Sequence, residues 1–565
     1  MDATQYRRTI EKQWELHRIR VLSPYLSFNP SSGTNGAAVT PGHSSTPFNR
    51  TIFPPDFIFG AGSSAYQIEG AAHLDGKGPS NWDTFTKNHP DHIKQSGCKP
   101  PPNGRAGIAP ASWCKKELLM RSTSTGGDER RVLTEKIEVT SSSGIVAADF
   151  YHRYKEDIQL MKKIGLDSFR FSISWSRVLP TGKIKGGVNQ QGVQFYNNLI
   201  NELLSNGIMP FVTIFHWDVP QALEDEYGGF LNSAIVNDYQ EYADFLFKTF
   251  GDRVKNWCTV NEPSIFTLIG YDLGLNAPGR CSNYVGNCAA GDSATEPYIV
   301  AHNLLLAHSA AVKVYKEKYQ VSQKGKIGIT LVTDWYKPKF NTQSSREATS
   351  RALDFNLGWF LHPITYGDYP ETMKSIVGNR LPKFTKSESD SLIGSFDFLG
   401  MNYYTANYAD ALPAVTTNHS YYVDIQANFT TEKNGVAIGE PTHISDFFMY
   451  PRGIQELLMY VKDKYKNPPV YITENGVGDP DTLPFIQAIK DGIRIRYLQG
   501  HLLHILKSIK SGANVKAYYV WSFLDDFEWA SGYTVRYGLT YVDFKNNLER
   551  HLKYSAYWLK RFLLK

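Results

Sequence analysis

Two stretches decide the fold of this chain: W-C-T-V-N-E-P, from Trp257 to Pro263, and P-V-Y-I-T-E-N-G, from Pro469 to Gly476. Each is an apolar run rich in aromatic and β-branched residues, which favours a buried strand. The first run ends at Glu262 and the second at Glu474. Cleavage of a glycosidic bond requires two carboxyl groups that face each other across one sugar, and these two glutamates form a plausible pair.

Similar runs recur along the chain and alternate with helical patterns. The eight β-prone runs begin at Phe57, Asp167, Pro210, Val254, Ile327, Phe396, Pro469 and Lys516. The amphipathic stretches between them include residues 150–164, 298–319 and 454–464. Eight such alternations predict an α/β fold of the (β/α)8 TIM barrel type, a single domain with long loops. In that fold the active site lies at the C-terminal ends of the strands, where both glutamates stand. A doubly wound sheet is the alternative, but no G-x-G-x-x-G follows the first run.

The sequence also predicts where the domain begins and where it is interrupted. Residues 1–52 have no sustained periodicity and are predicted to form a poorly ordered leader, so the barrel is expected over residues 53–564. Residues 97–143 are polar, aperiodic and rich in Pro, Gly and Ser. We interpret them as a disordered insertion or as translated non-coding sequence, with an active-site lid as the functional alternative.

Composition excludes several classes of function. The 565-residue chain has a net charge of only +5, which gives no support to nucleic-acid binding, and it has no apolar run long enough to span a membrane. The N-terminus lacks the apolar segment of a signal peptide. Cys281 and Cys288 bracket a short polar loop and could form a disulfide in an oxidising compartment. Three glycosylation sequons, at Asn49, Asn418 and Asn428, weakly favour secretion, in conflict with the missing signal peptide.

A series of longer motifs identifies a family. They are residues 57–71 (F-I-F-G-A-G-S-S-A-Y-Q-I-E-G-A), 170–180 (R-F-S-I-S-W-S-R-V-L-P), 215–223 (F-H-W-D-V-P-Q-A-L), 400–404 (G-M-N-Y-Y) and 521–529 (W-S-F-L-D-D-F-E-W), together with the two glutamate segments. From about Phe53 to Leu564 the chain resembles plant β-glucosidases of glycoside hydrolase family 1. The leader and the insertion lie outside the resemblance.

The resemblance implies that Glu474 is the nucleophile and Glu262 the acid/base of a retaining hydrolysis of O-linked β-D-glucosides with small aglycones. Arg170 and Tyr404 are expected to hold the Glu474 carboxylate by charge and by a hydrogen bond. The implied sugar-binding residues are Gln67, His216, Asn261, Trp521, Glu528 and Trp529. No cofactor or metal is implied, the partner is a small-molecule glucoside, and a homo-oligomer is left open. The family suggests the vacuole or the apoplast.

Two departures concern the substrate. Asp446 stands where plant relatives often carry a Trp that forms one wall of the aglycone slot, and Asp526 stands where the family commonly has Asn. Because Glu262 is present, the chain is not expected to be a thioglucosidase, which has Gln there. The alternatives are a transglucosidase or disaccharide-specific glycosidase with the same carboxylates, and an inactive sugar-binding relative, including a chain disabled by its insertion.

Overall fold

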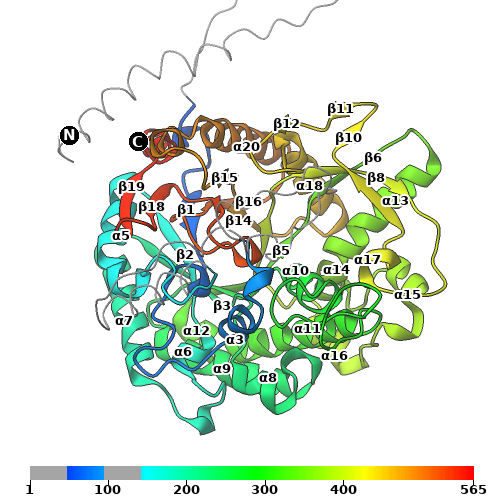
Figure 1. Ribbon diagram of the computed structural model, residues 1–565, viewed down its shortest axis with the longest axis horizontal. Helices are drawn as coiled ribbons and strands as arrows, with labels where there is room; N and C mark the ends of the chain where they lie inside the picture. Colours follow the sequence, from blue (N-terminus) through cyan, green and yellow to red (C-terminus); the bar gives the residue numbers. More distant parts are fainter. Residues whose placement is uncertain (1–47, 95–141, 565) are drawn as a thin grey trace, which may run out of the picture.

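The centre of the protein is a closed barrel of parallel strands (Figure 1). The computed structural model describes residues 48–94 and 142–564. The barrel strands are β1 (Ile58–Gly62), β2 (Ser168–Ser172), β3 (Met209–Phe215), β4 (Asn256–Asn261), β5 (Lys326–Val332), β7 (Phe398–Asn402), β14 (Val470–Asn475) and β16 (Val515–Trp521). Each pairs with the next in this order, and β16 closes on β1. All eight predicted strands are therefore present, and the predicted (β/α)8 fold is confirmed.

Helices surround the barrel and connect consecutive strands (Figure 1). Those of eight or more residues are α3 (Asn81–Asn88), α5 (Phe150–Ile164), α7 (Gln190–Ser205), α9 (Ala234–Phe250), α11 (Glu296–Val314), α13 (Gln343–Leu353), α14 (Trp359–Tyr366), α18 (Pro451–Lys464), α20 (Gly492–Lys510) and α21 (Tyr554–Leu563). The C-terminal helix α21 packs against both α5 and α20, so it joins the first and last parts of the helical layer. None of the helices in the described part of the chain is long and apolar enough to cross a membrane.

Shorter helices and strands lie in the segments that connect the barrel strands and the long helices. The shorter α-helices are α2 (Ala65–Ile68), α6 (Trp175–Val178), α8 (Gln221–Tyr227), α10 (Pro263–Thr267), α12 (Gln320–Gln323), α15 (Glu371–Val377), α16 (Lys386–Leu392), α17 (Tyr421–Asp424) and α19 (Phe485–Ile489). A three-stranded sheet contains β6 (Trp335–Pro338), β8 (Ala406–Ala411) and β9 (Ala427–Thr430). Two-stranded pairs are β10 (Glu432–Lys433) with β11 (Val436–Ala437), β12 (Glu440–Pro441) with β13 (Phe448–Met449), β15 (Asp479–Pro480) with β17 (Val535–Arg536), and β18 (Thr540–Asp543) with β19 (Glu549–Leu552).

A layer of aromatic rings fills the barrel interior beneath the strand ends. Phe211 of β3 contacts Phe398 of β7, Tyr471 of β14 and Tyr519 of β16, with ring centroids 5.4–6.1 Å apart. Since these strands are not neighbours of β3, the contacts cross the barrel axis. A Cβ atom at Gly60 would lie 2.4 Å from the Tyr519 ring, so only glycine fits there. The layer supports the residues nearer the C-terminal strand ends.

The folded domain takes in several residues that the sequence assigned to the leader. Arg50 makes two hydrogen bonds, of 3.0 and 2.9 Å, to the Asp167 carboxylate just before β2, and the Phe48 ring packs against Phe562 of α21. The domain therefore begins at or before Phe48 rather than at Phe53. The rest of the predicted leader, residues 1–47, and residues 97–141 of the predicted insertion lie outside the described residues. The end of the predicted insertion belongs to the folded domain, because Ser143 is buried and its carbonyl accepts from the Tyr533 hydroxyl at 2.9 Å.

Candidate active site

The two glutamates lie at the C-terminal ends of their strands, as predicted. Glu262 directly follows β4 and precedes α10, with a left-handed backbone (φ 44°). Glu474 is the fifth of the six residues of β14. Their exposed fractions are only 7% and 3%, so both carboxyl groups are largely removed from water.

Glu474 is held by two donors. One guanidinium nitrogen of Arg170 lies 2.6 Å from one carboxylate oxygen, and the Tyr404 hydroxyl donates to the other at 2.7 Å. Arg170 is the central residue of β2, and its side chain is fully buried. Burial lowers the pKa of Arg170, but its neighbours, with the Glu474 charge foremost, together raise the pKa above its ordinary value. Each oxygen of the Glu474 carboxylate therefore has its own donor, and one of the two donors is a buried cation.

Glu262 has the opposite environment. Burial raises its pKa well above the ordinary value, and the nearby Glu474 charge raises it further. One hydrogen bond acts the other way: the Asn402 amide donates to a Glu262 oxygen at 2.6 Å. Glu262 therefore keeps its proton near neutral pH. Sequence reasoning missed Asn402, although the residue lies in the G-M-N-Y-Y motif next to Tyr404.

Asn261 and His216 form one hydrogen-bonded unit with Arg170. The side-chain oxygen Oδ1 of Asn261 accepts from Arg170, and the side-chain amide nitrogen of Asn261 lies 3.0 Å from Nε2 of His216. Burial, and then the Arg170 charge, lower the pKa of His216 well below its usual range, so its ring is neutral. With Nε2 accepting from the amide, Nδ1 carries the proton. Nδ1 is buried and has no partner within the described chain, so it is free to donate to a sugar hydroxyl.

Gln67 and Glu528 form a second polar unit. The Gln67 amide donates to a Glu528 oxygen at 3.2 Å, and Ser64 donates to the Gln67 carbonyl at 2.7 Å. Burial raises the pKa of Glu528 to about 7. Burial, together with the charge of the nearby Glu528, raises the pKa of Asp526 well above its ordinary value. Burial next to a second carboxyl group therefore favours the neutral form of Asp526.

Three tryptophans enclose the space above these groups. The His216 ring lies nearly parallel to Trp521 and to Trp529, with centroids 6.0 and 5.9 Å apart. Trp217 packs against Trp529 at 4.6 Å and donates from its indole nitrogen to the Asn261 carbonyl oxygen. Trp521 and Trp529 were predicted, whereas Trp217 was not. The structure thus brings the predicted sugar-binding residues into two hydrogen-bonded units and one aromatic wall.

Comparisons with known proteins agree with this geometry. The family model of glycosyl hydrolase family 1 matches residues 49–100 and 130–565. The chain belongs to glycosyl hydrolase family 1. It is 53% identical to β-glucosidase 17 of Arabidopsis thaliana over 522 residues, 92% of each chain. It is 47% identical to raucaffricine-O-β-D-glucosidase of Rauvolfia serpentina, over 93% of this chain and 94% of the relative. A solved structure of a rice β-glucosidase mutant, in a covalent complex with glucose, matches with a TM-score of 0.81 and 42% identity, covering 92% of this chain and all of the other.

Membership of family 1 confirms the resemblance to plant β-glucosidases and the prediction of a glycoside hydrolase of the β-glucosidase type. The roles of the individual residues remain predictions, supported by the contacts above. The structure adds a disulfide between Cys281 and Cys288, the pair that the sequence suggested.

The remaining predicted positions lie away from the carboxylates. Asn418 and Asn428 are exposed, whereas Asn49 is half-buried and its side chain caps a short helix by accepting from Thr51. Asp446, at the family 1 position often occupied by Trp, is exposed in the loop between β12 and β13. The next residue, Phe447, has its ring 6.3 Å from that of Tyr404, so an aromatic side chain still faces the site from this loop.

Proposed function

We propose that this family 1 member is a retaining β-glucosidase that hydrolyses O-linked β-D-glucosides of small plant metabolites. The observation that carries the proposal is the asymmetry of the two carboxyl groups. Glu474 is paired with Arg170 and Tyr404, while Glu262 is desolvated and holds its proton. A retaining glycosidase requires this division between an ionised nucleophile and a protonated acid.

In the first step a Glu474 carboxylate oxygen attacks the anomeric carbon as the bond from that carbon to the aglycone oxygen breaks. The Glu262 proton moves to the leaving oxygen, and the aglycone departs as an alcohol. As Glu474 becomes an ester, its negative charge is lost and the pKa of Glu262 falls. Glu262 can then remain ionised and act as the base in the second step. The product is a glucosyl ester on Glu474.

In the second step the Glu262 carboxylate takes a proton from water, whose oxygen attacks the anomeric carbon. The ester bond to Glu474 breaks, glucose leaves with its β configuration, and both carboxyl groups return to their starting states. Arg170 and Tyr404 stabilise the departing carboxylate in this step. The covalent glucose complex of the rice relative supports such an intermediate.

The sugar subsite supports a glucose unit. His216 offers a donor, Gln67 and Glu528 offer adjacent groups for paired hydrogen bonds, and Trp521 offers a flat face for the apolar side of the ring. A plant-metabolite aglycone is supported by the relative named raucaffricine-O-β-D-glucosidase. The exposed Asp446 and the adjacent Phe447 give the aglycone side a mixed polar and aromatic border, which favours aglycones that carry hydroxyl groups.

Labelling with 2-deoxy-2-fluoro-glucosyl fluoride tests the mechanism. We expect the intact mass to rise by one fluoroglucosyl unit and peptide mapping to place the label on Glu474, because the 2-fluorine slows breakdown of the ester. Glu474→Gln should take no label. Glu262→Gln should still be labelled, since fluoride leaves without acid assistance. Label on any other residue, or none on a folded and active protein, would refute the assignment.

We also propose a secretory destination, the vacuole or the apoplast. The Cys281–Cys288 disulfide and the exposed sequons at Asn418 and Asn428 support an oxidising, glycosylating route. Expression in plant cells followed by glycosidase digestion and imaging of a tagged full chain tests this proposal. A protein that remains unglycosylated in the cytosol would overturn it.

A further inference from the structure

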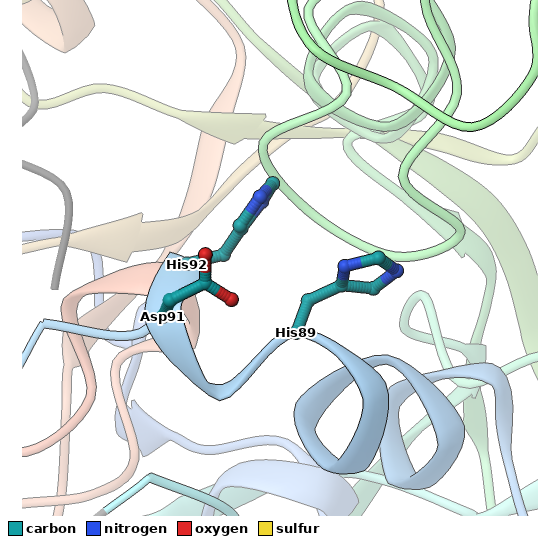
Figure 2. A group of neighbouring side chains, drawn as sticks. All are labelled: His89, Asp91 and His92. Carbon is teal, nitrogen blue, oxygen red and sulfur yellow. The ribbon is translucent and has the colours of Figure 1, made fainter. Parts of the chain in front are cut away.

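A second group of chemically active side chains lies outside the sugar site, on the turn that follows α3. His89 is the C-cap residue directly after α3, and Asp91 and His92 belong to the short 3₁₀ helix η3 (Pro90–His92). One ring nitrogen of each histidine and one carboxylate oxygen all lie within 4.8 Å of one another. Figure 2 shows the three side chains on one side of the turn, with the Asp91 carboxylate pointing to the space between the two rings.

We propose that His89, Asp91 and His92 bind one divalent first-row transition-metal ion of the Zn²⁺ type, with water in the remaining coordination positions. Two imidazoles and one carboxylate are a ligand set that such ions prefer. With only one carboxylate, the group is poorly suited to Ca²⁺ or Mg²⁺, which require several oxygen ligands. The site is additional to the hydrolysis that family 1 membership implies.

The backbone holds the three ligands in place before a metal arrives. Pro90 fixes the first residue of η3 between the two histidines, and Ile93, directly after the turn, is fully buried. The amide of Lys94 then donates to the Ala530 carbonyl at 2.8 Å, which ties the turn to the segment that carries Trp529. A tetrahedral Zn²⁺ site needs donor atoms roughly 3.3 Å apart. Asp91 is exposed and both histidines are half-buried, so their side chains have room to rotate. Such rotation can bring the three donor atoms from within 4.8 Å to the separation that the metal requires.

His92 is prepared to act as a ligand. Its Nδ1 is buried and has no hydrogen-bond partner within residues 48–94 and 142–564, which is unfavourable for a polar atom. The His92 ring packs edge-on against Phe85, 5.6 Å away, and lies 5.2 Å from the His89 ring. A bound ion would satisfy the orphaned nitrogen.

Calorimetric titration of the purified, metal-stripped full chain with ZnCl₂ tests the proposal. We expect the double variant His89→Ala/His92→Ala to bind one equivalent less than the wild type. The matched control is His443→Ala, which removes a histidine outside the proposed site. The His443 ring also lies beside a carboxylate, that of Asp479, but within the part of the chain that the structure describes it belongs to no group of three potential metal ligands. The control should retain every equivalent that the wild type binds. MgCl₂ should neither bind to this site nor displace Zn²⁺.

Asp91→Asn is the second variant, because the exposed carboxylate can change without disturbing the packing of either ring. We expect its Zn²⁺ affinity at this site to fall by at least about tenfold, the order seen when a metal site loses a supporting group. In the presence of chelator, the thermal midpoint and the hydrolytic rate of Asp91→Asn should equal those of the wild type. An unchanged number of Zn²⁺ equivalents in the double variant would overturn the proposal, as would equal competition by Mg²⁺.

Discussion

We expect the hydrogen bond from Asn402 to Glu262 to set how far into alkaline pH Glu262, the proposed catalytic acid, keeps its proton. The bond is 2.6 Å long and stabilises the carboxylate, so it lowers the pKa of Glu262 against the larger effects of burial and the Glu474 charge. Asn402→Ala removes the donor and leaves those two effects in place. The pKa of Glu262 should then rise, and the protonated form should persist to higher pH.

The size of the shift follows from the difference between two hydrogen bonds. A bond to a charged group contributes about 1.5–3 kcal/mol and a bond to a neutral group about 0.5–1.5 kcal/mol. Deleting the donor therefore costs the carboxylate about 1–1.5 kcal/mol more than it costs the acid. Because one pKa unit corresponds to about 1.4 kcal/mol, the alkaline limb of the pH profile should move up by about one unit.

The assay is kcat/KM between pH 4 and pH 10 with a glucoside whose aglycone is a poor leaving group, so that protonation by Glu262 limits the rate. Thr473→Val is the matched control. The Thr473 hydroxyl donates to the Asn402 carbonyl at 2.6 Å, so this variant loosens Asn402 but leaves its donor facing Glu262. The alkaline limb of the Thr473→Val profile should shift by less than half as far as that of Asn402→Ala. An alkaline limb in Asn402→Ala that stays in place, or moves to lower pH, would refute the reasoning.

Four further outcomes are expected. Glu474→Ala should lower hydrolysis by about 10³-fold or more in initial-rate assays, and near-normal activity would contradict its role as nucleophile. Asp526→Asn keeps a neutral side chain beside Glu528, so we expect kcat/KM and its pH profile to change by less than about twofold, whereas a large change would mean that Asp526 is ionised. Burial raises the pKa of Asp218 to about 8 and of Glu224 to about 7. Between about pH 4 and pH 8 the native state therefore binds more protons than the unfolded state, so stability falls as the pH rises. The thermal midpoint should be lower at pH 8 than at pH 5, and a higher midpoint at pH 8 would contradict these protonation states. Cys281→Ser opens a disulfide whose cysteines are 7 residues apart, and should cost about 2 kcal/mol of unfolding free energy in denaturant titrations, with no loss if the thiols are unpaired in the protein.

Local patterns were sufficient for the barrel and for the two glutamates. Each strand is a short run whose burial on both faces leaves little polar alternation, and all eight could be located within a few residues. Glu262 and Glu474 stand directly after or within such runs, so their position at the catalytic face followed from the fold. The motifs then supplied the sugar-binding residues, which the structure brings together.

What the sequence could not supply depends on contacts between distant segments. The Asn402 amide reaches Glu262 across 140 positions of sequence, and no local signal marks it as the donor that opposes burial. Arg50 joined the fold through Asp167, 117 residues away, although its neighbours have the composition of a leader. In both cases a single long-range polar contact decides the role of a residue in an otherwise uninformative context.

The site also holds its backbone against local preference. Glu262, Trp217 and Trp529 have φ values of 44°, 76° and 50°, a left-handed conformation that costs a residue with a side chain about 1–3 kcal/mol. The contacts explain why the fold maintains them. Trp217 and Trp529 pack against each other, Trp217 also donates to the carbonyl that precedes Glu262, and Glu262 turns the chain from β4 into α10. A relaxed backbone at any of the three would redirect its side chain away from these partners. The strain is therefore concentrated where the acid and the aromatic wall are positioned, and the aromatic layer beneath provides the rigid support that such a site requires.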